Sequence, residues 1–191
     1  MTDTATATEL SRSRTLWELV ARRAALTPDT TVLLEAAEDP AADRRLTFRE
    51  LHDRAERVAA GLHDMGVRPG TVVAWQLPTR IETVLLSIAL ARLGAVQTPV
   101  IPFYRDREVG FALRESKAEF FATPGVWRGH DYPAMARRLG ARGLFDAYED
   151  LPDGDPGTLP HRPPTAPTCG GSTGPPAPPP TPRASCTPTG P

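Results

Sequence analysis

The sequence predicts an open α/β fold, in which a parallel β-sheet is flanked by helices, followed by a disordered tail. Short apolar segments rich in β-branched residues alternate with segments of helical periodicity between residues 15 and 146. The segments at 71–76 and 96–100 are separated by a helix of crossover length, which favours parallel pairing of two strands. The composition then changes abruptly at Pro160, since 11 of the next 31 residues are proline.

Charge and composition exclude several classes of function. The chain has 191 residues and a net charge of −1, with basic and acidic residues interspersed, so neither a nucleic-acid footprint nor a polybasic membrane anchor is indicated. The most apolar segment, 81–93, includes Glu82, Ser87 and Arg92 and is shorter than the roughly 20 residues of a membrane span. The N-terminus lacks the apolar core of a signal peptide, so we expect a cytoplasmic protein with a small-molecule substrate. The two cysteines lie in the tail, which excludes a disulfide scaffold in the folded part.

The first third of the chain predicts a helix and a hairpin. Residues 1–13 are polar and expected to be flexible. Thr15 and Glu18 have capping-box spacing and open a helix that stops at Pro28. The segments 31–35 and 45–48 flank a polar turn and predict an antiparallel pair of strands.

The centre of the chain predicts helix, strand, helix and strand in turn. Thr47 and Glu50 form a second capping-box pattern, and Gly66 is placed to end that helix in a left-handed turn. Residues 71–76 (TVVAWQ) predict a buried strand. Thr79 and Glu82 form a third capping-box pattern for a helix over 81–93, which is apolar on nearly every side and therefore expected to be interior. Residues 96–100 predict the next strand.

The last predicted elements complete the alternation. Asp106 is a candidate cap for a helix that carries Val109 and Leu113. Strands are predicted at 119–123 and 143–145, with a helix at 132–139 between them and a surface loop at 151–160. Strands and helices at this spacing favour a parallel sheet covered on both faces.

Three motifs resemble the first subdomain of the adenylate-forming acyl-CoA synthetases. They are residues 47–51 (TFREL), 66–79 (GVRPGTVVAWQLPT) and 91–99 (ARLGAVQTP), and the likeness extends over residues 15–160. Thr79 stands where the family usually has Asn, and Thr71 where Asp is common. The resemblance implies a partial AMP-binding domain over residues 14–160, nearest to the branch acting on cyclohexanecarboxylate and fatty acids. It also implies that the intact family activates a carboxylic acid with ATP and Mg, and transfers the acyl group to CoA.

The phosphate-binding loop of that family is missing from the sequence. The loop combines small residues, hydroxyls and a lysine, which bring backbone N–H groups and a cation to the phosphates. The nearest string, residues 170–174 (GGSTG), has no lysine and is followed by prolines, so a flexible linker is the simpler interpretation.

A shifted reading frame offers an explanation for the missing loop. If the codons for residues 168–190 are read from their third base, the fixed letters allow the string VRWIYWTSGTTADPKGVLHTD, which contains the loop. We therefore interpret residues 161–191 as an out-of-frame translation caused by a frameshift near Pro160 or a sequencing error. The lysine requires an AGG or AGA codon at Arg183. The alternative is a genuine Pro-rich linker or partner ligand with P-x-x-P spacing.

We assign no catalytic, cofactor-binding or metal-ligating residue, because every candidate has a simpler structural interpretation. His52 and His63 fall on a charged helix and are expected to be solvated, while His130 and His161 lie in predicted loops without further ligands at metal-binding spacing. Trp75 is expected in the core. A solvated acidic run comprises Asp146, Glu149, Asp150, Asp153 and Asp155. Tyr104 and Arg105 follow a strand and could line a substrate tunnel.

The sequence therefore predicts a truncated AMP-dependent acyl-CoA synthetase homologue without activity of its own. We expect no cofactor for this fragment, whereas the intact family uses ATP, Mg and CoA. Two alternatives remain open: a non-catalytic interaction or complementing subunit that works with a separately encoded remainder, and a decayed remnant without a role.

Overall fold

The computed structural model describes residues 10–160, so the predictions for residues 1–9 and 161–191 lie outside the described residues. The helices are α2 (Leu16–Leu26), α3 (Phe48–Asp64), α4 (Ile81–Leu93), α5 (Asp106–Ser116) and α6 (Tyr132–Arg138), with 3-10 turns η1 (Pro40–Ala42) and η2 (Pro156–Thr158). The strands are β1 (Thr31–Glu35), β2 (Arg44–Thr47), β3 (Val72–Trp75), β4 (Val96–Pro99), β5 (Phe120–Thr123), β6 (Val126–Trp127), β7 (His130–Asp131) and β8 (Leu144–Asp146).

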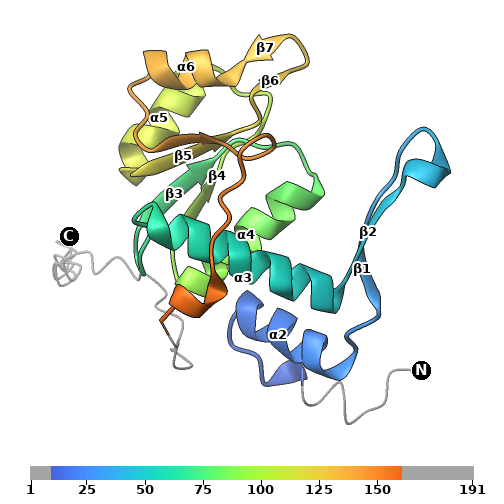
Figure 1. Ribbon diagram of the computed structural model, residues 1–191. Coiled ribbons are helices and arrows are strands. Elements are labelled where there is room, and N and C mark those ends of the chain that lie inside the picture. Colours follow the sequence, from blue (N-terminus) through green and yellow to red (C-terminus); the bar gives the residue numbers. More distant parts are fainter. Residues whose placement is uncertain (1–9, 161–191) are drawn as a thin grey trace, which may run out of the picture.

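The central sheet consists of four parallel strands in the order β4-β3-β5-β8 (Figure 1). Val73 of β3 lies opposite Gln97 of β4 on one side and Phe120 of β5 on the other. The predicted parallel pairing of the strands on either side of α4 is confirmed. The connection from β3 to β4 and the connection from β5 to β8 run in opposite directions along the sheet, so the strand order reverses between β3 and β5. In open α/β folds, ligands bind at the carboxyl ends of the strands at such a reversal.

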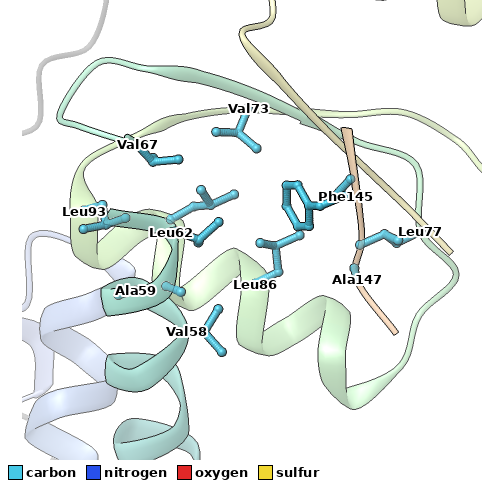
Figure 2. Packing of buried hydrophobic residues seen from close by; sticks show 13 residues of the cluster. Val58, Ala59, Leu62, Val67, Val73, Leu77, Leu86, Leu93, Phe145 and Ala147 are labelled. Atoms are coloured by element: carbon cyan, nitrogen blue, oxygen red, sulfur yellow. The ribbon is translucent and has the colours of Figure 1, made fainter. Parts of the chain in front are cut away.

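Helices cover both faces of this sheet, as predicted. The core on one face lies between α3, α4 and the sheet, and Val58, Leu62, Val73, Leu86 and Phe145 converge in it (Figure 2). The opposite face packs against α5 and α6 through a second cluster of buried residues. Most of α4 is buried, which confirms that this helix is interior.

Of the N-terminal elements, α2 lies below α3 in Figure 1 and the β1-β2 hairpin lies at the right, beyond the amino end of α3. Strands β1 and β2 make the predicted antiparallel hairpin, with Leu33 opposite Leu46 (Figure 1). A third apolar cluster joins this hairpin and α2 to the two central helices, and it includes Val20, Leu51 and Leu85. The hairpin is thereby fixed to the amino end of α4.

Two of the predicted helix boundaries are confirmed and one is half right. Thr47 and Glu50 form a complete capping box at the start of α3, and Gly66 adopts a φ of 104° after its end. At α2, the hydroxyl of Thr15 accepts the N–H of Glu18, but the Glu18 carboxylate accepts the N–H of Arg14 instead of closing the box.

Two predicted caps are wrong. Arg80, not Thr79, is the N-cap of α4, and its guanidinium makes no capping bond because it has no acceptor atom. The Glu82 carboxylate, expected to complete the box, instead forms an ion pair with Arg44. Asp106 is the first residue of α5 rather than its cap, since the backbone N–H of the preceding residue is accepted by Glu108. In each case a charged partner other than the predicted one satisfies the helix terminus.

Smaller differences concern Trp75 and the segment before α6. Trp75 is half-buried rather than enclosed, with its indole N–H donated to Gln97 at 3.3 Å. Strands β6 and β7 form a short hairpin that was not predicted, with Arg128 and Gly129 both at positive φ in its turn. Within residues 10–160, no helix has the length and apolar character needed to cross a membrane.

Candidate functional site

The carboxyl end of the sheet is organised by Gln76, which immediately follows β3. Its backbone N–H is donated to Ala122 of β5, and its side chain is fully buried. The Gln76 amide donates to the carbonyl oxygens of Ile101 and Tyr104 at 2.9 and 3.0 Å. Gln76 therefore holds the loop that follows β4 against the end of β3.

Tyr104 and Arg105 lie in that loop, but their surroundings differ from those of a substrate tunnel. The Tyr104 side chain is exposed, and Arg105 donates to the carbonyls of Pro102 and Tyr104 at 2.9 and 2.8 Å. Tyr132 of α6 donates to the same Pro102 carbonyl at 2.8 Å. The Arg105 guanidinium thus stabilises its own loop, and a role toward a substrate stays a prediction.

Sequence reasoning missed two polar residues at this end of the sheet. Gln76 Oε1 and Thr123 Oγ1 are buried and have no hydrogen-bond partner among the described residues. Gln76 directly follows β3, and Thr123 is the last residue of β5. A polar residue at the carboxyl end of an apolar strand is the sequence pattern that could have identified them as candidates. The partners of the Gln76 amide N–H groups could not be inferred, because the carbonyls of Ile101 and Tyr104 come from a different part of the chain.

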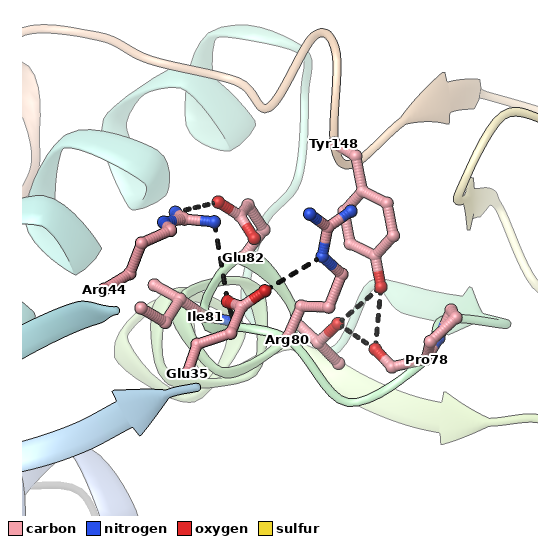
Figure 3. Close-up of polar contacts among 8 residues, drawn as sticks. Glu35, Arg44, Pro78, Arg80, Ile81, Glu82 and Tyr148 are labelled. Atoms are coloured by element: carbon pink, nitrogen blue, oxygen red, sulfur yellow. Dashed lines mark hydrogen bonds and ion pairs between the residues drawn. The ribbon is translucent and has the colours of Figure 1, made fainter. Parts of the chain in front are cut away.

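A second polar group, the hairpin cluster, joins the β1-β2 hairpin to the amino end of α4 (Figure 3). The Glu35 carboxylate accepts the backbone N–H of Ile81 at 3.1 Å and pairs with Arg44 and Arg80 at 3.4 and 3.2 Å. Arg44 also pairs with Glu82, which raises the pKa of Arg44. These contacts attach the β1-β2 hairpin to the amino end of α4.

The pKa values in this cluster reflect opposing effects. Burial raises the pKa of Glu82, but hydrogen bonds and the charges of Arg44 and Arg80 outweigh it, so the net pKa is below the usual value. Burial raises the pKa of Tyr148, whose hydroxyl donates to Pro78 at 2.7 Å beneath the Arg80 guanidinium. The Tyr148 hydroxyl thus holds the loop after β3 in place through the carbonyl of Pro78.

The acidic side chains between residues 146 and 155 lie at the surface, where two of them accept backbone N–H groups in turns. Asp146 accepts the backbone N–H groups of Tyr148 and Glu149, and Asp155 caps η2. Asp153 forms an exposed ion pair with Arg57, which lowers the pKa of Asp153. Glu149 and Asp150 are exposed, as predicted for a solvated run.

The histidines are less solvated than predicted. His52 stacks on Trp17 with ring centroids 4.9 Å apart, and its ring nitrogen lies 3.0 Å from Asp53. His63 is half-buried, and His130 lies in β7 rather than a loop, edge-on to Tyr132. His161 lies outside the described residues. The part of the chain that the structure describes contains no group of three or more His, Cys, Asp or Glu suited to a metal ion.

The parallel sheet, its two helical layers and the reversal of strand order between β3 and β5 define an open α/β domain of the nucleotide-binding type. Comparison with known proteins gives the family. The chain belongs to the AMP-binding enzyme family, whose model matches residues 20–181. That match extends beyond residue 160, into the segment that contains residues 170–174 and lies outside the described residues.

Several of the curated relatives are named as ligases. The chain is 35% identical over 144 residues to a salicyl-AMP ligase / salicyl-S-ArCP synthetase of Mycobacterium tuberculosis, which covers 75% of the chain and 25% of the relative. It is 39% identical over 85 residues to 4-coumarate–CoA ligase 4 of Arabidopsis thaliana, covering 44% of the chain and 15% of that ligase. The chain therefore spans about a quarter or less of these relatives' length.

Solved structures show the same fold. A protein of Rhodopseudomonas palustris described as a long-chain-fatty-acid CoA ligase superposes with a TM-score of 0.60 at 29% identity, covering 71% of this chain and 33% of that protein. The o-succinylbenzoate CoA synthetase of Bacillus subtilis, solved with its acyl-adenylate intermediate, gives 0.59 at 26% identity, with coverage of 72% and 32%. The described residues match the N-terminal subdomain of the adenylate-forming fold.

Proposed function

We propose that this chain is the N-terminal portion of an acyl-CoA synthetase and does not activate carboxylic acids by itself. In the complete enzyme, the reaction would be formation of an acyl adenylate from ATP and a carboxylic acid, followed by transfer of the acyl group to CoA. Family membership over residues 20–181 supports the chemistry. The chain spans 25% of the salicyl-AMP ligase and 33% of the long-chain-fatty-acid CoA ligase, so the activity of the complete enzyme is itself part of the proposal.

The position of the lysine carries the argument against turnover by this chain. The sequence contains a single lysine, Lys117, and the family's phosphate loop uses a lysine as a cationic partner. Lys117 ends α5 just before β5 begins, so it lies at the amino edge of the sheet. Nucleotides bind at the opposite, carboxyl edge in open α/β folds. The described residues therefore do not fit the triphosphate of ATP.

The acid that the complete enzyme used is proposed only as a class. The relatives' names include salicyl, coumarate and long-chain fatty acid ligases, so both aromatic and aliphatic carboxylic acids are candidates. The motifs favour the aliphatic branch, and we propose an alicyclic or fatty acid. We also propose a cytoplasmic location for the protein.

We propose the frameshift as the reason for the missing loop. Sequencing the coding DNA across codons 155–191 tests it, because the loop lysine requires AGG or AGA at Arg183. A CGN codon there contradicts the proposal. In that case a genuine Pro-rich segment, and with it a complementing or interaction subunit, becomes the better interpretation of residues 161–191.

ATP–pyrophosphate exchange tests the expected inactivity. The purified chain would be assayed with salicylate, 4-coumarate, cyclohexanecarboxylate and a long-chain fatty acid, beside the Bacillus subtilis o-succinylbenzoate synthetase as a positive control. We expect no exchange above the protein-free rate with any acid. Acid-dependent exchange by this chain alone would contradict the proposal. Exchange that appears only when a separately expressed C-terminal remainder is added would favour the complementing subunit.

A further inference from the structure

An apolar groove lies between α2, α4 and the β1-β2 hairpin, next to Trp75 at the end of β3. Helix α2 and the β1-β2 hairpin form one wall, α4 forms the floor, and Trp75 stands at the end of β3. The groove has a volume of about 590 Å³ and is lined almost entirely by carbon. Its apolar lining includes Leu19, Val20, Phe48, Trp75, Val84 and Ile88.

The described part of the chain ends close to this groove. Arg92, near the carboxyl end of α4, donates to the carbonyl of Pro160 at 3.4 Å and lies over the ring of Trp17 in α2. Ile88, which lines the groove, precedes Arg92 by four residues, a rise of about 6 Å along the helix. The described part of the chain therefore ends, at Pro160, beside the carboxyl end of α4 and close to α2.

We propose that the Pro-rich segment 175–182 of the same chain binds in this groove. Six of its eight residues are proline, so the segment has few N–H groups to leave unpaired and loses little conformational entropy on binding. Apolar grooves that contain aromatic side chains are the usual receptors of such segments. Phe48 and Trp75 supply the aromatic surfaces here.

Length and tethering permit the contact. Pro175 follows Pro160 by fifteen residues, which can span about 45 Å when extended at about 3.1 Å per residue. A tether of this kind gives an effective concentration on the order of millimolar, so a weak intrinsic affinity is sufficient. Arg23, whose guanidinium lies over Phe48 at the groove, can donate to the carbonyls of an extended backbone.

A second copy of the chain fits the groove less well. A stable protein–protein interface buries about 800 Å² on each partner, whereas this surface is concave and small. A narrow segment matches such a shape better than a folded domain does. The proposal concerns the chain as translated, and it does not depend on whether the complete enzyme activates an acid.

The two cysteines of the chain allow a direct test, since Cys169 and Cys186 flank the segment. A nitroxide is attached to Cys186 in a Cys169→Ser variant of the full chain enriched in ¹⁵N. We expect paramagnetic broadening of the amide resonances of α2 and α4, and none for α5, which covers the opposite face of the sheet. Equal effects on both faces, or no effect on either, would overturn the proposal.

Charged substitutions in the groove provide matched controls. Val84→Arg and the more exposed Leu19→Arg should each abolish the selective broadening, whereas Phe111→Arg on α5 should leave it unchanged. Retention of chemical-shift dispersion shows that a variant is folded. Two groove variants are used so that the test still works if one of them does not fold. A further sample mixes a spin-labelled chain with a ¹⁵N-enriched chain that carries no nitroxide. Broadening of the resonances of the ¹⁵N-enriched chain would show that the segment binds a second copy and would reject the intramolecular contact.

Discussion

The carboxylate of Glu35 accepts the backbone N–H of Ile81 at 3.1 Å, although the two residues are 46 positions apart. Ile81 is the first residue of α4, and its N–H would otherwise have no partner within the helix. A strand residue thus performs the task that a neighbouring Ser, Thr or Asp performs at most helices. The negative charge also lies at the positive end of the helix dipole.

Replacement of Glu35 by Ala should destabilise the domain by about 0.5 to 2 kcal/mol, the range found for the loss of an N-terminal cap. The substitution removes the bond to Ile81 and leaves Arg44 and Arg80 without one of their partners. Urea unfolding monitored by circular dichroism measures the change. Glu35→Gln should lie between wild type and Ala, because the amide oxygen still accepts the N–H but carries no charge.

Glu38 offers the matched control for this prediction. It follows Glu35 by three residues and its side chain is exposed, so Glu38→Ala should alter the free energy of unfolding by less than about 0.5 kcal/mol. Equal losses from both variants would mean that net charge, rather than capping of α4, determines the effect.

The ion pair between Arg44 and Glu82 predicts a dependence of stability on pH. The folded-state pKa of Glu82 is lower than its usual value, so the unfolded chain binds more protons at acidic pH. The contribution of Glu82 is therefore complete above its unfolded pKa, near 4.3, and is lost as the pH falls through the folded-state pKa. Urea unfolding between pH 3 and 6 should show the difference between wild type and Glu82→Gln shrinking as the pH decreases.

The difference between the two proteins isolates this site. Glu50 and Asp153 also have lowered pKa values, but they are present in both proteins and cancel in the comparison. Glu115→Gln, on the exposed surface of α5, should show no such trend. A wild-type advantage over Glu82→Gln that stays constant across this range would show that the Glu82 charge does not stabilise the fold.

Gln76→Leu should loosen the loop after β4 while the sheet persists. Leucine keeps the volume but removes both amide N–H groups, so the carbonyls of Ile101 and Tyr104 lose their buried donor. Leaving such groups unsatisfied costs about 1 to 3 kcal/mol. Hydrogen exchange should accelerate most for the amides of Val100 and Tyr104, which bond within or next to this loop. Equal acceleration in β8 would indicate global unfolding instead.

The capping pattern shows what the sequence could predict and what it could not. Thr47 and Glu50 lie within one helical turn, so local spacing was sufficient to place the start of α3. Thr79 and Glu82 have the same spacing, but Arg44 from the hairpin competes for Glu82, and Glu35 supplies the cap of α4. A local sequence pattern therefore predicts the wrong cap where a charged residue from a distant part of the chain is the stronger partner of the helix terminus.

The same limit applies to the carboxyl end of the sheet. The alternation of strands and helices was enough to predict a parallel sheet covered on both faces, because periodicity and loop length reside in neighbouring residues. Tyr104 and Arg105 were correctly placed after a strand, whereas the role of Gln76 was missed. Its amide is satisfied by carbonyls 25 and 28 positions away, and no local pattern records such partners.

Gly61→Ala should destabilise the domain even though alanine is the better helix former by about 1 kcal/mol. A Cβ at Gly61 would lie 2.4 Å from the backbone N of Asp153 and 2.7 Å from the carbonyl carbon of Pro152, and backbone atoms cannot move aside as a flexible side chain does. The loop must therefore separate from α3, which breaks the bond from Gly154 to Arg57 and the ion pair of Arg57 with Asp153. Overpacking of this kind costs about 1 to 3 kcal/mol, so the clash outweighs the propensity gain.

Asp153→Asn separates the clash from the ion pair. Because that pair is exposed, its loss alone should cost less than about 1 kcal/mol, and the effect should decrease with added salt. The loss in Gly61→Ala should persist at high salt, since a steric clash is not screened. Urea unfolding of both variants at low and high ionic strength makes the comparison. If Gly61→Ala were as stable as wild type, the close approach of the 151–155 loop to α3 would not contribute to the fold.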